Sequence, residues 1–324
     1  MRESLEAVFG VQDGLITRRQ ALRFLTDGAL QYRLGREWQV VLPGVYAADR
    51  SPLADRQRLR AALLYAGTAS MLNDTSALRM YGVPFVPVDH DVRVLIPDDV
   101  QRLSRQFVVT KRSWRLPEPV VVDGLPTAPI DRALCEFGAR HESERDSLAV
   151  LAAAVQEGRA TLAALFEEAH AGQARGRPRL LRVLAPLEAG VRSAPEADFR
   201  ALVARSRTLP TPMWNCLIEL ANGARFSPDA LFQDAALIHE VNGRQYHAGE
   251  GGEDAFDAMQ RRNDALVAAG FAVLHNSPRR LHMDPGGALR EVERVYRAHA
   301  GRGMPRGVKL LRGGPPGTEL AQAM

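Results

Sequence analysis

The feature that most constrains the fold is a pair of short apolar runs separated by a turn in the C-terminal third of the chain. The first run covers residues 226–232, and the second, Ala236–Asn242, is closed by Gly243. Both runs are too short for helices and are bounded by Gly and Asp. They therefore predict two strands joined by a tight connection at Gln233-Asp234.

Two carboxylates, Asp229 and Glu240, fall within these predicted strands. Side chains alternate along a strand, so Ile238, Glu240 and Asn242 share one face. A carboxylate among apolar neighbours is costly to bury unless a cation or a donor meets it. Asp229 and Glu240 would share a divalent cation, Mg²⁺ or Mn²⁺, because hard cations take oxygen ligands and keep several waters. The alternative is a solvated sheet end, and the pair alone leaves both interpretations open.

The patterns on both sides of this pair complete a small α/β unit over residues 193–300. The expected order is α-β-β-β-α-β-α. Its elements are a helix opened by Ser193-Ala194-Pro195-Glu196, strands near 215–220, 226–232 and 236–242, a helix over 254–269, a strand over 271–275 and a final helix after Asp284-Pro285.

This unit resembles the PD-(D/E)XK restriction-endonuclease-like fold, and it is most similar to an actinobacterial branch related to very-short-patch mismatch repair endonucleases. The resemblance is carried by the helix start at Glu196, the Asp229 strand, the motif E-V-N-G-R-Q-Y-H and the run R-R-N-D-A-L-V-A-A-G-F-A-V-L. It implies that Asp229 and Glu240 are metal ligands and that Glu196 is a supporting acid. It also implies that one face is lined by His247, Arg261, Arg262 and Asp264.

One position departs from that family in a way that bears on catalysis. The archetype has Lys two residues after the Glu, the related branch usually has Asp, and this chain has Asn242. An asparagine positions a water or a ligand but is neither an acid nor a cation. Asn242 or His247 would orient or deprotonate the attacking water, although the neighbours of His247 also suit an ordinary loop.

Glu196 and the two arginines have structural interpretations of equal standing. Ser193-x-x-Glu196 is itself a capping box, which would account for the glutamate without any catalytic role. Arg261 and Arg262 would hold phosphates, or they would pair with Glu253 and Asp257 at helical spacing.

The first 50 residues carry three short helical patterns followed by a β-hairpin, which is typical of a winged helix-turn-helix. Thr17-Arg18-Arg19-Gln20 is a capping box, and the hairpin turns at Pro43-Gly44. The segments D-G-L-I-T-R-R-Q-A-L and W-Q-V-V-L-P-G-V-Y resemble the N-terminal domain of AbiEi-type antitoxins.

By this resemblance the third helix, over 29–35, would enter the major groove of DNA. The residues expected to contact DNA there are Gln31, Tyr32, Arg33 and Arg36, with Arg18 and Arg19 at a helix start facing phosphates. The alternative is that these arginines form a solvated face and that the module mediates protein contacts.

Four segments are expected along the chain. They are a winged helix-turn-helix over 1–50, an AbiEi-like mixed α/β middle region with a helical linker over 51–192, the nuclease-like domain over 193–300 and a disordered tail over 301–324, in which Val308–Leu311 is a candidate to dock as a short segment. Within the middle region the patterns predict helices at 54–66 and 69–81, and the Gly/Arg-rich stretch 172–182 is expected to begin the connection to the nuclease-like domain.

Charge and cysteine content narrow the class of protein to which this chain can belong. The net charge of +4 is compatible with nucleic acid. Two cysteines exclude a zinc cluster and a disulfide framework, and the chain shows no leader or membrane-spanning run, so we expect a cytoplasmic protein.

The resulting hypothesis is a multidomain α+β and α/β DNA-binding protein with a Mg²⁺-dependent endonuclease domain. The alternative is a transcriptional regulator or antitoxin with an inactive nuclease-like domain, for which a cognate toxin and a homodimer are the expected partners.

Overall fold

The structure is a computed structural model that describes residues 4–172, 175–241 and 252–312. Backbone contacts divide the chain into two compact units, Met1–Leu184 and Ala185–Met324. Both units combine helices with sheets, as the predicted multidomain α+β class requires. Within the described residues, no helix is both long enough and apolar enough to cross a membrane.

Unit 1 begins with three short helices and a three-stranded sheet of order β1-β3-β2. The helices are α1 (Leu5–Val11), α2 (Arg18–Ala21) and α3 (Asp27–Arg33), and the strands are β1 (Leu15–Thr17), β2 (Gln39–Leu42) and β3 (Val45–Ala47). The predicted capping box at Thr17 and Gln20 is confirmed, with both reciprocal hydrogen bonds present. Gly44 takes the φ of 76° that the turn between β2 and β3 requires.

A five-stranded sheet of order β6-β5-β4-β8-β7 forms the centre of unit 1. Its strands are β4 (Met71–Leu72), β5 (Val92–Pro97), β6 (Val108–Ser113), β7 (Val120–Val122) and β8 (Leu125–Thr127), and the helices beside it are α4 (Asp55–Ala66) and α5 (Asp74–Met80). The predicted helix over 69–81 is wrong at its start. Met71 and Leu72 are buried and pair with β5, so sheet packing outweighs the helical periodicity there.

Helices α6 (Ile130–Arg140), α7 (Glu144–Gln156) and α8 (Leu162–Ala171) belong to unit 1, and α9 (Arg177–Glu188) crosses from unit 1 into unit 2 after Leu184. The described part of the stretch 172–182, which is predicted to begin the connection, consists of a turn and the first residues of α9. One apolar core joins Leu15, Leu42 and Val45 of the first 50 residues to Ala62 of α4 and Val94 of β5.

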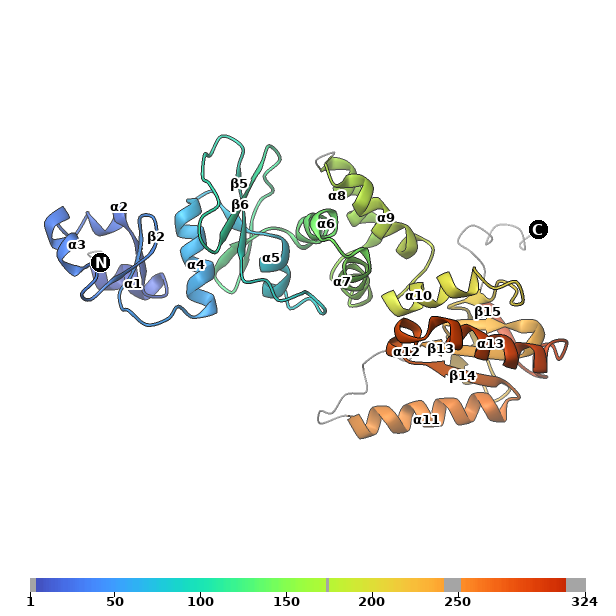
Figure 1. Cartoon of the computed structure of the whole chain (residues 1–324). Coiled ribbons are helices and arrows are strands. Elements are labelled where there is room, and N and C mark those ends of the chain that lie inside the picture. Colours follow the sequence, from blue (N-terminus) through green and yellow to red (C-terminus); the bar gives the residue numbers. More distant parts are fainter. Residues whose placement is uncertain (1–3, 173–174, 242–251, 313–324) are drawn as a thin grey trace. The chain divides into compact units, whose positions relative to one another are not determined.

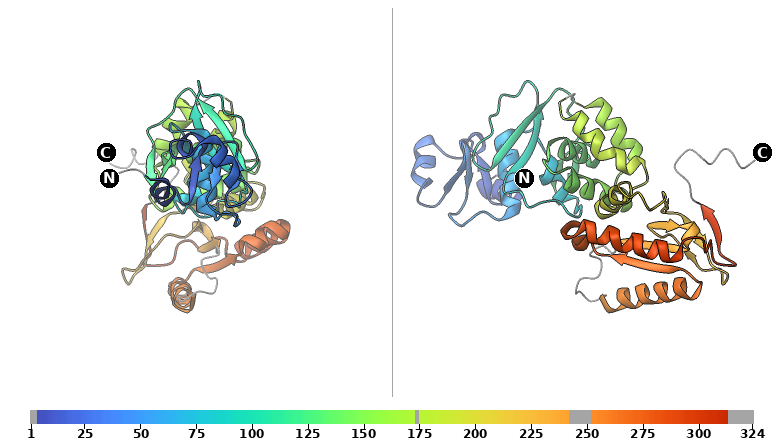
Figure 2. Two further views of the ribbon diagram at one scale, coloured as in Figure 1. Left: turned by 90° about the vertical axis from the view of Figure 1, so that its left-hand side faces the viewer. Right: turned by 45° about the vertical axis from the view of Figure 1, so that its right-hand side comes forward.

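Unit 2 contains a four-stranded sheet of order β14-β13-β12-β9, in which β13 and β14 are parallel and the other pairs are antiparallel. The strands are β9 (Met213–Trp214), β12 (Ala230–Phe232), β13 (Leu237–Val241) and β14 (Ala272–Asn276), and the helices are α10 (Ala194–Val203), α11 (Gly252–Ala268), α12 (Pro278–Met283) and α13 (Pro285–His299). Helices α10, α12 and α13 cover one face and α11 covers the other (Figure 1), and two further views show the same layers (Figure 2).

One of the predicted strands is interrupted, and a second is shorter than predicted. The run 226–232 divides into β11 (Arg225–Phe226) and β12, which belong to different sheets, because Pro228 has no N–H to continue a ladder. The run 215–220 begins with Asn215 at a φ of 50°, which separates β9 from β10 (Leu217–Glu219). Asp229 consequently lies in a bend just before β12 rather than in the middle of a strand.

The beginning of the predicted disordered tail is ordered. Residues Lys309–Arg312 form β15, which pairs with β10, and Val308 packs against the apolar core beneath that sheet. Residues 313–324 lie outside the described part of the chain.

The predicted tight connection after β12 is the short 3₁₀ helix η1 (Gln233–Ala235). It ends at Ala236, a buried residue in the left-handed conformation with a φ of 47° and a ψ of 40°. Such a conformation is uncommon for a residue with a Cβ, so packing around Ala236 holds the turn in place.

Candidate functional site

Asp229 and Glu240 are brought together by the register of two antiparallel strands in unit 2. Ala230 of β12 lies opposite His239 of β13. One step further along the same register, Asp229 comes opposite Glu240, and directly opposed residues present their side chains on the same face. The predicted alternation of β13 also holds, since Ile238 packs in the core on the α11 side and Leu237 packs in the core on the other side.

The carboxyl group of Asp229 is fixed by the backbone of the neighbouring strand. Its Oδ2 atom accepts a hydrogen bond of 2.7 Å from the N–H of Val241. Burial raises the pKa of Asp229 above its ordinary value; the Val241 N–H opposes this shift, and the nearby negative charge of Glu196 adds to it. The proton is therefore held more tightly than on a solvated aspartate, as expected where negative charge is not fully compensated.

Glu240 lies on β13 with only 13% of its side chain exposed. Arg262 of α11 donates a hydrogen bond of 2.8 Å from Nη2 to Oε1 of this glutamate. Burial raises the pKa of Glu240 to about 7, Arg262 opposes the shift, and the charge of Asp229 reinforces it. A carboxyl group with this pKa exchanges its proton near neutral pH, which is a property expected of an acid–base or cation-binding group.

Arg262 joins α11 to the loop before β12 as well as to β13. The same Nη2 atom donates a hydrogen bond of 3.1 Å to the backbone carbonyl of Ser227. Its guanidinium also lies 5.6 Å from the centre of the Phe226 ring. These contacts direct Arg262 toward the carboxylates. They account for its position without an ion pair to Glu253 or Asp257 on its own helix.

Glu196 is buried and takes part in a hydrogen-bond network at the start of α10, with 1% of the residue exposed. Its Oε1 atom accepts from Arg200 Nη2 and from Asn215 Nδ2, each at 2.6 Å. Its Oε2 atom accepts from the N–H of Arg192 at 2.8 Å. The predicted capping box is half right: Ser193 caps Glu196, whereas the glutamate carboxylate turns back to the residue before the cap.

The predicted site residues therefore fall into three groups. Asp229, Glu240 and Arg262 are brought together, and the charge of Glu196 reaches Asp229. Arg261 and Asp264 have exposed side chains, and no described contact joins either of them to the carboxylates. Asn242 and His247 lie outside the described residues.

Neighbouring residues outside the predicted site also contribute to this cluster. Arg192 donates a hydrogen bond of 3.2 Å to Ser227, and Asn215 Nδ2 also donates to the carbonyl of Gly190 at 3.0 Å. His275, which stands where the resembled family usually has an arginine, lies beside Glu240 in the parallel ladder and contacts Asn263 at 3.2 Å. Asn215 carried a local signal, because asparagine tolerates the left-handed backbone conformation that separates β9 from β10.

The donor set at Asp229 and Glu240 fits a divalent cation. The two partly buried carboxylates lie beside Arg262, and Asp229 also feels the charge of Arg192, yet both have raised pKa values. A hard cation would supply the missing positive charge and would take its other ligands from water. The described residues include no cluster of three or more His, Cys, Asp or Glu side chains suited to a metal.

The N-terminal residues proposed to contact DNA are mostly at the surface of unit 1. Arg36 lies over the ring of Tyr32 at 4.1 Å, and Tyr32 is 61% exposed. Arg33 forms an ion pair of 3.2 Å with Glu37. Arg18 pairs with Asp27. Arg19 and Gln31 are also exposed.

Comparisons with known proteins add little to this description. No family model and no curated protein matches the chain. Among solved structures, the chain is similar to the RV2827C protein from Mycobacterium tuberculosis, with a TM-score of 0.38 and 17% identity over 65% of this chain and 85% of that one. A similarity of this size carries no argument about fold or function.

Proposed function

We propose that this protein binds DNA and that unit 2 is a PD-(D/E)XK-like nuclease domain with Asp229 and Glu240 at its active site. The observation that carries the proposal is the juxtaposition of these two partly buried carboxylates, both with raised pKa values, at β13 and at the bend before β12, beside Arg262. The helices on both faces of a mixed sheet agree with the predicted order of elements.

The residues of the cluster suit phosphodiester chemistry. Asp229 and Glu240 would hold Mg²⁺, which when bound activates water and stabilises charge on a phosphate. The backbone N–H of Val241 keeps Asp229 in one orientation, so the pair is preorganised. The planar guanidinium of Arg262 matches the oxygens of a phosphate group and would orient the scissile phosphate.

The N-terminal part of unit 1 supports the DNA-binding half of the proposal. Its three short helices, the hairpin of β2 and β3 and the additional strand β1 agree with a winged helix-turn-helix. The exposed pair of Tyr32 and Arg36 extends from the end of α3 into the turn that follows, where a recognition helix would meet DNA.

Cleavage of duplex DNA by the full chain, with Mg²⁺ or Mn²⁺ and with EDTA, tests the proposal. Asp229→Asn and Glu240→Gln should each lower the cleavage rate at least a hundredfold. The matched control is Glu219→Gln, which alters a glutamate paired with Arg225 in the other sheet of unit 2. Equal cleavage by Asp229→Asn and the parent would show that the active site is elsewhere.

A second function is favoured by the Arg262–Glu240 ion pair. A buried glutamate that already has a cationic partner does not need a metal, and Asn242 supplies neither an acid nor a cation. These features suit a transcriptional regulator or antitoxin in which the nuclease-like domain contacts DNA or a second copy of the chain. The regulator would bind DNA as tightly with EDTA as with Mg²⁺ and would leave the DNA intact.

A further inference from the structure

Unit 1 contains a pocket that the proposed nuclease function does not use. It lies among β6, α6, α8 and the start of α9, and its cavity volume is about 30 Å³. Its basic side chains are Lys111, Arg132, Arg175 and Arg177, and its acidic side chains are Glu136 and Glu168. The lining therefore has an excess of two positive charges.

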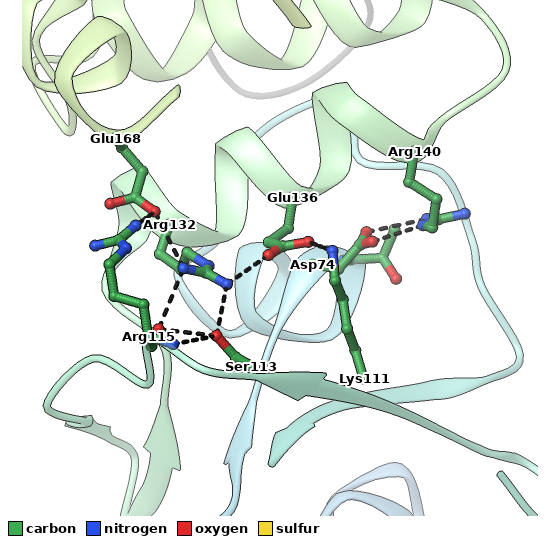
Figure 3. Close-up of polar contacts among 9 residues, drawn as sticks. Asp74, Lys111, Ser113, Arg115, Arg132, Glu136, Arg140 and Glu168 are labelled. Atoms are coloured by element: carbon green, nitrogen blue, oxygen red, sulfur yellow. Dashed lines mark hydrogen bonds and ion pairs between the residues drawn. The ribbon is translucent and has the colours of Figure 1, made fainter. Parts of the chain in front are cut away.

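Glu136 and Glu168 already form ion pairs with basic side chains (Figure 3). Arg132 donates from Nη2 to Oε1 of Glu136 at 2.8 Å, and Lys111 pairs with the other oxygen of that glutamate. Glu168 is bound by Arg115 and, at 3.4 Å, by Arg132. Arg175 and Arg177 have no described carboxylate partner at the pocket, although Nη2 of Arg177 donates to the carbonyls of His170 at 2.9 Å and Gly172 at 2.7 Å.

Arg132 is the residue that distinguishes this pocket from an ordinary surface cluster. Only 4% of it is exposed, and it lines the pocket. Its Nε atom is buried and has no hydrogen-bond partner, and the same is true of Nε of Arg177. A buried charged donor without an acceptor is costly, so such a group indicates an acceptor that the protein chain does not supply.

We propose that this pocket binds a phosphate group, either as inorganic phosphate or as the phosphate of a small molecule. Several guanidinium groups and one ammonium group around one cavity are the donors that recognise phosphate oxygens. A dianion would compensate the two excess charges and would accept from the buried donors. The inference is independent of the carboxylate cluster in unit 2 and does not require the chain to bind or cleave DNA.

Calorimetric titration of the full chain with inorganic phosphate, and separately with a nucleoside 5′-monophosphate, tests the proposal at constant ionic strength. Arg175→Gln should weaken binding at least tenfold without affecting the fold, because Arg175 is exposed. The matched control Arg182→Gln should bind as the parent does, because Arg182 pairs with Glu144 and does not line the pocket. Tighter binding of the nucleotide would identify a small molecule as the source of the phosphate.

The two cysteines of the chain provide a second measurement with an internal control. Cys135 lines the pocket in unit 1, whereas Cys216 belongs to a core in unit 2, and both are buried. Phosphate at ten times its Kd should slow thiol labelling of Cys135 about tenfold through linkage and leave labelling of Cys216 unchanged. No binding at millimolar phosphate, or equal slowing of both thiols, would overturn the proposal and leave a purely structural ion-pair network.

Discussion

Arg262 of α11 and Glu240 of β13 form a 2.8 Å ion pair across the face of the sheet in unit 2. The arginine is 38% exposed in its side chain, whereas the glutamate is 13% exposed. The ion pair therefore joins a partly exposed arginine to a mostly covered carboxylate. A change of charge at Arg262 should alter the pKa of Glu240 and its affinity for a cation.

Replacing Arg262 should change metal affinity. Arg262→Gln removes the cation that competes for Glu240, so we expect Mn²⁺ to bind on the order of tenfold more tightly, a change of about 1.4 kcal/mol. Calorimetric titration of parent and variant at the same pH measures this. The control is Arg261→Gln, on the exposed side of the same helix. Unchanged affinity in Arg262→Gln would separate the arginine from any metal site.

The pH dependence of stability should reveal Glu240. Its pKa is raised from 4.5 to about 7, so between those values the folded state keeps a proton that the unfolded state has lost. Stability should fall as pH rises through this window and level off above it, by roughly 3 kcal/mol in total. Metal affinity should rise across the same range, because the metal binds the ionised form. Urea denaturation of Glu240→Gln should lack this fall, and a parallel profile would contradict the assignment.

Replacement of Glu196 should lower the stability of unit 2 more than it lowers the rate of cleavage. Glu196→Ala would leave Arg200 and Asn215 without their shared acceptor, and loss of one partner from a buried ion pair costs about 3–5 kcal/mol. Denaturation followed by the fluorescence of Trp214, after replacement of Trp38 and Trp114, reports on unit 2 alone. Glu291→Ala, which breaks a more exposed pair with Arg280, should cost about 1 kcal/mol or less. If Glu196→Ala loses little stability but no longer cleaves DNA, Glu196 has a catalytic role instead.

DNA binding should depend on the end of α3 and the turn that follows it. Arg36→Ala should weaken binding, and if it removes one phosphate contact the salt slope should decrease by about 0.9. Fluorescence anisotropy with duplex DNA at several salt concentrations measures both quantities. Arg182→Ala, an exposed arginine on α9 of the same unit, serves as the control. The winged-helix interpretation fails if the two variants bind equally well.

Some of this architecture was predictable from local chemistry. The capping box at Thr17 and the hairpin turn at Gly44 follow from residues a few positions apart, and both were expected. The turn between Phe232 and Ala236 was expected for the same reason. Local rules decide these features because the groups that satisfy each other are neighbours in the chain.

Features that depend on distant residues were not predictable. The break of one expected strand at Pro228 becomes clear only when its halves pair with different sheets. The hydrogen bond that Glu196 accepts from Asn215 joins α10 to a residue that no spacing rule connects to it. Likewise, β15 is ordered because β10 offers it an edge, although its own composition suggested a disordered tail.

The strained Ala236 turn has a consequence for how this chain can vary. Because the turn fixes the register of β12 against β13, loss of one residue from Gln233–Ala235 would set Val241 opposite Asp229. Glu240 would then point into the core that contains Phe199, and His239, now stacked on Phe199, would turn toward the core beneath α11. Insertions or deletions of an even number of residues in this turn should therefore be tolerated, because they leave each side chain of the cluster on its present face of the sheet. A change by an odd number of residues should not be tolerated.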